Sequence, residues 1–224
     1  MGWAIAISIG GLVAGLLAVA VYSPLLALRT VTVDGNVKVS AEDVHAAIDE
    51  QMGTPLALLD YESLKSKLDV YPLIRSFSTE IVPPSTLKIH VVERAPMGIV
   101  SSSSGFQVID PAGVVLESVL RRPDGIPLID LAGQGTDSVA FFSVVDVMLA
   151  LPESIRSRVD VIQATSQDDV RLVLVGAGQR VTWGSSDRSA LKARVLEELM
   201  ATQEPNVHVE FDVSAPLSPV VRRG

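Results

Sequence analysis

Cysteine is absent from this 224-residue chain, and aromatic residues make up only 4% of it. The first absence excludes disulfides, cysteine-ligated zinc and thiol chemistry, although it assigns no compartment, because many extracytoplasmic domains also lack disulfides. Few aromatic residues disfavour a stacking platform for bases. Basic residues are also scarce, since 18 Lys and Arg stand against 26 Asp and Glu and give a net charge of −8. Nucleic acid is therefore not an expected partner.

Catalytic motifs are equally scarce. The chain has only three histidines, and it contains neither an H-E-x-x-H nor a G-x-S-x-G motif. The stretch from Ser189 to Lys192 matches the S-x-x-K motif of penicillin-binding proteins, but no S-D-N or K-T-G follows it. We interpret Lys192 as a solvated residue on an amphipathic helix. The sequence thus predicts no enzyme, no metal site, no cofactor and no small-molecule substrate.

A glycine-rich stretch, GAGQ at residues 176–179, resembles the start of a dinucleotide-binding G-x-G-x-x-G. However, Val181 occupies the position of the third glycine. The stretch also lies between two expected strands, where a short glycine loop is typical of a hairpin. We expect a hairpin there.

One long apolar run is present at the N-terminus. Gly2 to Val21 carries no charge, and Trp3 and Tyr22 flank it like interfacial aromatic residues. About 20 helical residues span roughly 30 Å, the thickness of the hydrocarbon layer. The run favours an uncleaved transmembrane helix. A signal peptide with a cleavage site near Ala20 is the alternative, but the run is longer than a usual signal sequence and has no basic residues before it.

The basic residues that flank this helix do not decide its orientation in the membrane. No Lys or Arg precedes the run, and Arg29 follows it. Taken literally, the positive-inside rule would place the rest of the chain in the cytoplasm, but a single arginine does not decide the side.

Residues 24–94 show the pattern of a small α+β domain. The expected elements have the order β-α-α-β-β and are Thr30–Asp34, a helix after Ser40, a helix after Asp60, Arg75–Val82 and Thr86–Arg94. Ser40 with Asp43 forms a capping box, and Asp60 is an N-cap residue. Pro83-Pro84-Ser85 is expected to turn the chain between the last two strands.

Residues 95–213 show mainly short strands. We expect strands at Phe106–Asp110, Val114–Val119, Ile126–Leu131, Val159–Thr165, Val170–Val175, Gln179–Trp183 and Val207–Val213, and helices at Thr136–Leu151 and Asp187–Thr202. Pro216 and Pro219 are expected to prevent further pairing in a C-terminal tail, residues 214–224. The fold class is α+β: a transmembrane helix at residues 1–23, then the small domain, then a mixed β-domain with a largely antiparallel sheet and two or more helices.

His90 and Glu93 lie close together near the end of the small domain and suggest an acid–base pair. On a strand, however, residues i and i+3 point to opposite faces. His90 should share the outer face with Lys88, and Glu93 should share the inner face with Ile89 and Val91. The two side chains cannot converge on one proton or one metal ion.

The order of these segments resembles the FtsQ/DivIB cell-division family, in a form typical of actinobacteria. The resemblance is carried by VTVDGNVKVSAEDVHAAI, GTPLALLD, LKSKLDVYPLIRSFSTEIVPPSTLKIHVVERAP, IDPAGVV, IPLI, RVTWGSSDRSALKARVLEEL and VHVEFDVSAPLSPVV, and it covers almost the whole chain. It identifies residues 24–94 as a POTRA domain and residues 95–213 as the family's β-domain. The N-terminal cytoplasmic tail usual in the family is not present in this sequence.

The resemblance implies a non-catalytic protein that crosses the cytoplasmic membrane once. Its C-terminal domain would lie outside the cell membrane at the division septum, where it would bind divisome proteins of the FtsB and FtsL type. Partner strands would add to exposed sheet edges. The candidate edge residues are Val207, His208, Val209, Glu210, Phe211, Asp212 and Val213, with Leu87, Lys88, Ile89 and His90 as a second candidate edge.

Two other classes stay open at this point. Adaptors of outer-membrane assembly also use POTRA domains, but they should show several such units and a barrel of amphipathic strands. A membrane-anchored hydrolase would use Ser189 as its nucleophile and Lys192 as its base.

Overall fold

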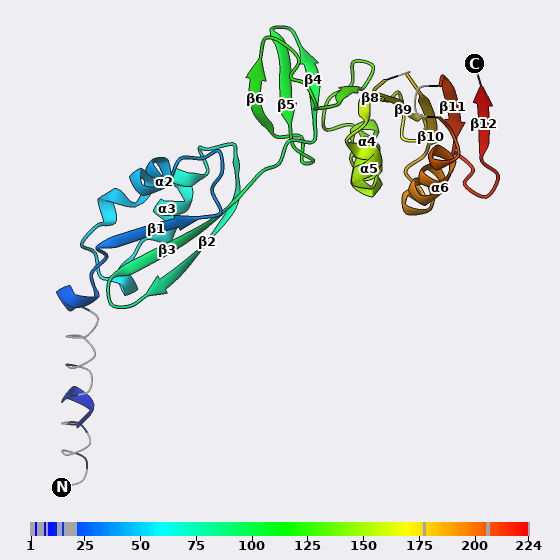
Figure 1. The fold of residues 1–224 in the computed structure, drawn as a ribbon. Coiled ribbons are helices and arrows are strands. Elements are labelled where there is room, and N and C mark those ends of the chain that lie inside the picture. The colour runs from blue at the N-terminus through cyan, green and yellow to red at the C-terminus, as the bar shows by residue number, and fades with distance from the viewer. Residues whose placement is uncertain are drawn as a thin grey trace. The chain divides into compact units, whose positions relative to one another are not determined.

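The structure is a computed structural model that describes Trp3, Ile7, residues 9–12, Gly15 and residues 22–176, 178–204 and 207–223. The expected transmembrane helix falls largely on positions outside the described residues, among them Gly2 and Val21, whereas Trp3 is described and exposed. Within the described part of the chain, no helix is both long enough and apolar enough to cross a membrane. The chain divides into two compact units, Met1–Ala95 and Pro96–Gly224 (Figure 1).

The first unit has the expected order β-α-α-β-β. Its elements are β1 (Thr30–Asp34), α2 (Ala41–Ile48), α3 (Tyr61–Leu68), β2 (Ile74–Val82) and β3 (Thr86–Glu93), with short 3₁₀ helices η1 (Pro24–Leu26), η2 (Asp49–Gln51) and η3 (Leu56–Leu58). Gly35 ends β1 with a φ of 75°, and a Cβ atom there would lie 2.2 Å from the carbonyl oxygen of Val91. Glycine is therefore required at this turn.

Both expected N-caps are confirmed. The Ser40 hydroxyl oxygen accepts a hydrogen bond from the Asp43 N–H at 3.1 Å, and an Asp60 carboxylate oxygen accepts one from the Ser63 N–H at 2.9 Å. Each cap satisfies one of the free N–H groups at a helix start, which typically contributes about 1 kcal/mol. The Ser40 hydroxyl also donates to the Asp43 carboxylate at 2.8 Å.

The sheet of this unit has the strand order β1-β3-β2. β1 runs parallel to β3, and β2 runs antiparallel to β3. The inner face of β3, with Leu87, Ile89 and Val91, packs against α2 and α3 in one core that includes Val44 and Leu64. The prediction that Leu87, Lys88, Ile89 and His90 form an edge is wrong, because β3 is the central strand and its backbone is paired on both sides; the edges are β1 and β2.

In the second unit, the described residues form a nine-stranded mixed sheet. Its strands are β4 (Gly98–Ser102), β5 (Gly105–Ile109), β6 (Val115–Val119), β7 (Leu128–Asp130), β8 (Val159–Ala164), β9 (Val170–Leu174), β10 (Arg180–Gly184), β11 (Val209–Asp212) and β12 (Val220–Arg223). The helices are α4 (Val139–Ala150), α5 (Glu153–Arg156) and α6 (Ser189–Ala201). The strand order is β12-β11-β10-β9-β8-β7-β4-β5-β6, and antiparallel pairs outnumber parallel ones.

The main core of this unit lies between the sheet and the helices α4 and α6. Phe141 and Val144 of α4 and Leu196 of α6 are fully buried there, together with Trp183 of β10 and Phe211 of β11. Gly176 and Gly178 lie between the antiparallel neighbours β9 and β10, in agreement with the hairpin prediction.

The C-terminal segment differs from its predicted form. Residues 220–223 form β12, which pairs antiparallel with β11, so the expectation of an unpaired tail is wrong. Pro216 and Pro219 lie in the connection before β12, where their missing N–H groups cost the sheet nothing. The Ser218 N–H donates to the carbonyl of Ala215 at 2.9 Å and helps the connection to reverse.

Candidate partner-binding surface

β11 has the predicted alternation of faces. Val209, Phe211 and Val213 are buried in the core, whereas Glu210 and Asp212 are half-buried on the opposite face. Strand β11 is nevertheless internal, because it lies between β10 and β12. Its backbone groups are therefore used within the sheet, and Val207 and His208 precede the strand. The prediction that residues 207–213 form a free edge is wrong.

The edge at this end of the sheet is β12. The Val213 N–H donates to the Thr182 carbonyl of β10 at 3.0 Å. Since backbone groups alternate sides along a strand, Glu210 and Asp212 direct theirs toward β12. Their partners are Arg222 and Val220. It follows that the N–H and C=O groups of Val221 and Arg223 point away from β11, toward the open side of the sheet.

The β12 strand carries positive charge in an acidic protein. The Arg222 guanidinium lies 3.8 Å from the Glu210 carboxylate, across the strand pair. On the other face, Arg223 donates to the side-chain carbonyl of Gln203, just beyond α6, at 3.3 Å. Val221 packs against the core from the same side. The edge therefore combines one anchoring apolar side chain with two exposed arginines.

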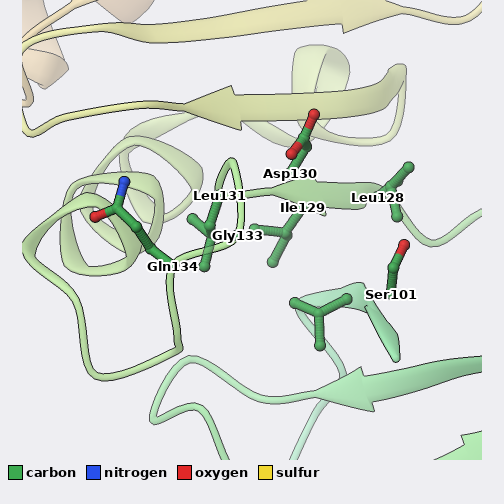
Figure 2. Close-up of a pocket in the computed structure, with 8 residues that line it drawn as sticks. Ser101, Leu128, Ile129, Asp130, Leu131, Gly133 and Gln134 are labelled. Carbon is green, nitrogen blue, oxygen red and sulfur yellow. The ribbon is translucent and has the colours of Figure 1, made fainter. Parts of the chain in front are cut away.

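A cleft of about 410 Å³ is lined by the end of β4 and by β7 with the loop that follows it (Figure 2). The two strands pair at one position, Ile99 with Leu128. The polar groups beside it are already engaged: Asp130 accepts from the Ala132 N–H at 3.0 Å, and Gln134 donates to the Thr165 carbonyl at 3.0 Å. Within the described residues, no group of three or more His, Asp or Glu side chains could hold a metal ion.

Ser189 and Lys192 come together, but not as a catalytic pair. Both are buried, with exposed fractions of 9% and 1%. The Lys192 ammonium donates to the carbonyls of Trp183 and Ser185 at 3.0 and 2.8 Å. The interpretation of Lys192 as a solvated residue is wrong, because the corner between β10 and α6 presents carbonyl groups that require a buried donor.

The Ser189 hydroxyl forms two hydrogen bonds in the same corner between β10 and α6. It accepts from the Trp183 indole N–H at 3.1 Å and donates to the Ser186 carbonyl at 2.7 Å. A nucleophilic serine must be reachable by substrate and activated by a base. Ser189 is buried, so substrate cannot reach it. Among the described contacts no hydrogen bond joins Ser189 to Lys192, so the lysine does not activate it. This geometry gives no support to the hydrolase alternative.

His90 and Glu93 lie on opposite faces of β3, as predicted. His90 is partly exposed, with Nδ1 against the Asp34 carboxylate and Nε2 3.6 Å from a Glu80 carboxylate oxygen. Lys88 lies 3.1 Å from Asp34 on the same face. The pKa of Asp34 is lowered, because hydrogen bonds and charge from Lys88 and His90 outweigh the opposing effect of burial.

Glu93 has a structural role that the sequence did not reveal. Its carboxylate accepts hydrogen bonds from the N–H groups of Val37, Lys38 and Val39 at 2.6 to 3.0 Å. Burial raises the pKa of this carboxyl, but the three N–H donors together lower it below its usual value. Glu93 thus fixes the loop between β1 and α2, more than 50 residues away in sequence.

The β-α-α-β-β unit defines the class of this protein. Residues 26–94 match the family model described as "POTRA domain, FtsQ-type". The chain is therefore a POTRA-domain protein in which one such domain precedes a larger β-rich unit.

Comparison over the longer chain gives the family. The "Cell division protein FtsQ" of Mycolicibacterium smegmatis is 30% identical over 220 residues, which are 98% of this chain and 64% of that protein. The protein of the same description from Streptomyces bingchenggensis is 31% identical over 208 residues (89% and 77%), and that from Streptomyces griseus is 30% identical over 213 residues (89% and 98%). This chain belongs to the FtsQ family of cell-division proteins.

Proposed function

We propose that this protein is a non-catalytic, single-pass membrane component of the bacterial divisome that binds other division proteins, of the FtsB and FtsL type, during septum formation. Membership of the FtsQ family supports the cell-division role. Ser189 and Lys192 of the S-x-x-K motif are buried and form structural hydrogen bonds, which favours a binding protein over an enzyme. Similarity over nearly the whole chain to FtsQ relatives disfavours an outer-membrane assembly adaptor.

The observation that carries the binding mechanism is the open side of β12. An extended partner segment would add there as a tenth strand and pair with the outward N–H and C=O groups of Val221 and Arg223. The exposed arginines would favour a partner strand that carries carboxylates. Because the edge strand has only four residues, the partner's backbone would make few hydrogen bonds, and side chains would supply much of the affinity.

The test removes one outward N–H group. Val221→Pro deletes this donor and places a ring at the edge, whereas Val221→Ala loses the same core contact but keeps the donor. The proline variant should bind a purified FtsB-type partner at least about fivefold more weakly than the alanine variant, since one hydrogen bond contributes about 1 kcal/mol. Affinity would be measured by calorimetry with the full chain in detergent.

Circular dichroism and thermal unfolding of both variants provide the folding control. Equal affinities for Val221→Pro and Val221→Ala, with both folded, would exclude strand addition at β12. Phe211 is unsuitable for this test, because it is 0% exposed and a charge there would disrupt the core instead of the edge.

The membrane topology has an independent test. We propose that residues 2–21 anchor the chain with both folded units outside the cytoplasm. Because the sequence has no cysteine, Ser103→Cys at the exposed tip between β4 and β5 introduces a unique thiol. A membrane-impermeant maleimide should label it in intact cells. Labelling only after permeabilisation would place these units in the cytoplasm.

A further inference from the structure

The outer side of α4 is apolar and exposed among the described residues of its own unit. Val139, Phe142 and Leu149 are 61%, 53% and 61% exposed, although the rest of this helix supplies core residues. Their spacing of three and seven places them along one side of the helix. A single exposed apolar residue is ordinary, but three aligned on one helix form a surface that indicates a partner.

Carboxylates border this apolar stripe. Asp146 lies within it on α4, Asp168 lies in the turn between β8 and β9, and Asp187 lies between β10 and α6. All three line a groove of about 280 Å³ together with Val139 and Phe142. Among the described residues, none of these three carboxylates forms an ion pair within 4 Å.

Two of these carboxylates accept hydrogen bonds from neutral side chains. The Ser186 hydroxyl donates to Asp146 at 3.3 Å, and the Ser185 hydroxyl contacts Asp187 at 3.4 Å. Arg188 follows Asp187 in sequence and is exposed, and none of the ion pairs of the described residues joins it to these groups. The buried Lys192 ammonium interacts electrostatically with Asp187 and Asp168, so with Arg188 two cations face three carboxylates. The groove keeps excess negative charge beside an apolar ridge, and a cationic partner would complement it.

We propose that this face of α4 binds an amphipathic, basic helix of another protein. The partner's apolar side would cover Val139, Phe142 and Leu149, and its Lys or Arg residues would reach the three carboxylates, as in other helix-in-groove contacts. A second copy of this face would bring like charges together, and an anionic lipid surface would be repelled. This surface is formed by residues other than those of β12, so the inference stands apart from the proposed strand addition.

The test is photo-crosslinking in growing cells that produce the full chain. p-Benzoylphenylalanine replaces Phe142, which is half-exposed and so tolerates substitution, and in a matched control it replaces Leu120, which is 86% exposed elsewhere in the same unit. Mass spectrometry identifies the crosslinked peptide. The expected product at position 142 is a peptide from a helix that has apolar residues on one side and Lys or Arg on the other.

Charge reversal supplies the second readout. Asp146→Lys with Asp187→Lys should lower the yield at position 142 by on the order of tenfold, because attraction becomes repulsion. Glu117→Lys with Asp124→Lys changes the total charge equally at exposed positions of the same unit and should leave the yield unchanged. A yield no higher than at position 120, an equal fall in both double variants, or crosslinks to a second copy or to lipid would each overturn the proposal.

Discussion

Lys192→Met is the substitution whose effect the structure defines best. The Lys192 ammonium is the buried donor for the carbonyls of Trp183 and Ser185. Trp183 lies where the β9–β10 register shifts, between Thr182 and Gly184, so its carbonyl is displaced from the regular ladder. Methionine has nearly the same length and fills the same space, but it donates no hydrogen bond.

The expected loss follows from the two carbonyls. Each buried acceptor left without a donor costs about 1–3 kcal/mol. Part of this cost is offset, because methionine avoids burying an ammonium group. We therefore expect the free energy of unfolding of the second unit to fall by about 2–4 kcal/mol.

Tryptophan fluorescence measures this change directly. The chain has two tryptophans, so a Trp3→Phe background leaves Trp183, which is fully buried beside Lys192, as the reporter. Denaturant unfolding of the full chain in mild detergent gives the free energy. Arg194→Met, an exposed change two residues along α6, is the control and should cost under about 0.5 kcal/mol. Equal stability of the two variants would refute the role assigned to Lys192.

The same variant has a pH signature. Burial lowers the pKa of the Lys192 ammonium below its usual 10.5. A lowered pKa means that the unfolded chain binds more protons between the folded and the unfolded values, so stability contributed by this group rises as pH increases through that window. Lys192→Met should remove this rise, and a parallel pH profile for the two proteins would contradict the assignment.

Three further outcomes are expected. Ser189→Ala should cost about 1–3 kcal/mol and shift Trp183 fluorescence, because the indole N–H loses its acceptor; unaltered emission would count against that bond. Because the pKa of Glu93 is lowered, its contribution is present above about 4.5 and is lost as pH falls through the folded value, so Glu93→Gln should flatten acid unfolding of the POTRA domain as followed by circular dichroism. Leu64→Ala, at a fully buried site of α3, should cost about 2–5 kcal/mol in thermal unfolding, and a loss below about 1 kcal/mol would contradict the packing described.

Local features of the POTRA domain followed directly from local sequence. Ser40 and Asp60 begin their helices as predicted, because an N-cap needs only a short polar side chain and the next three residues. Local backbone geometry also places His90 and Glu93 on opposite faces, because side chains alternate along any strand. Neither inference requires knowledge of what lies across the fold.

The position of a strand within its sheet could not be predicted from local sequence. The sequence of β3 and β11 predicts extended structure and correct faces, but not how many neighbours each strand has. Both were expected to be edges, and both are internal. For β11, the prolines after residue 213 suggested an end to pairing; they lie in a connecting segment, and β12 then returns to cover the edge.

At the Ser189–Lys192 pair, local sequence predicted one property and tertiary contacts decided another. Its spacing fixes both side chains on one helical face, and that much the sequence determined. Whether that face meets solvent, substrate or unsatisfied carbonyls depends on the β10–α6 corner, which forms only when the sheet and α6 pack together. The sequence alone determined the helix starts of the POTRA domain, the faces of β3 and β11, and the family of this protein. Tertiary structure decided which strand is the free edge and which lysine is buried, because both depend on contacts between residues far apart in the chain.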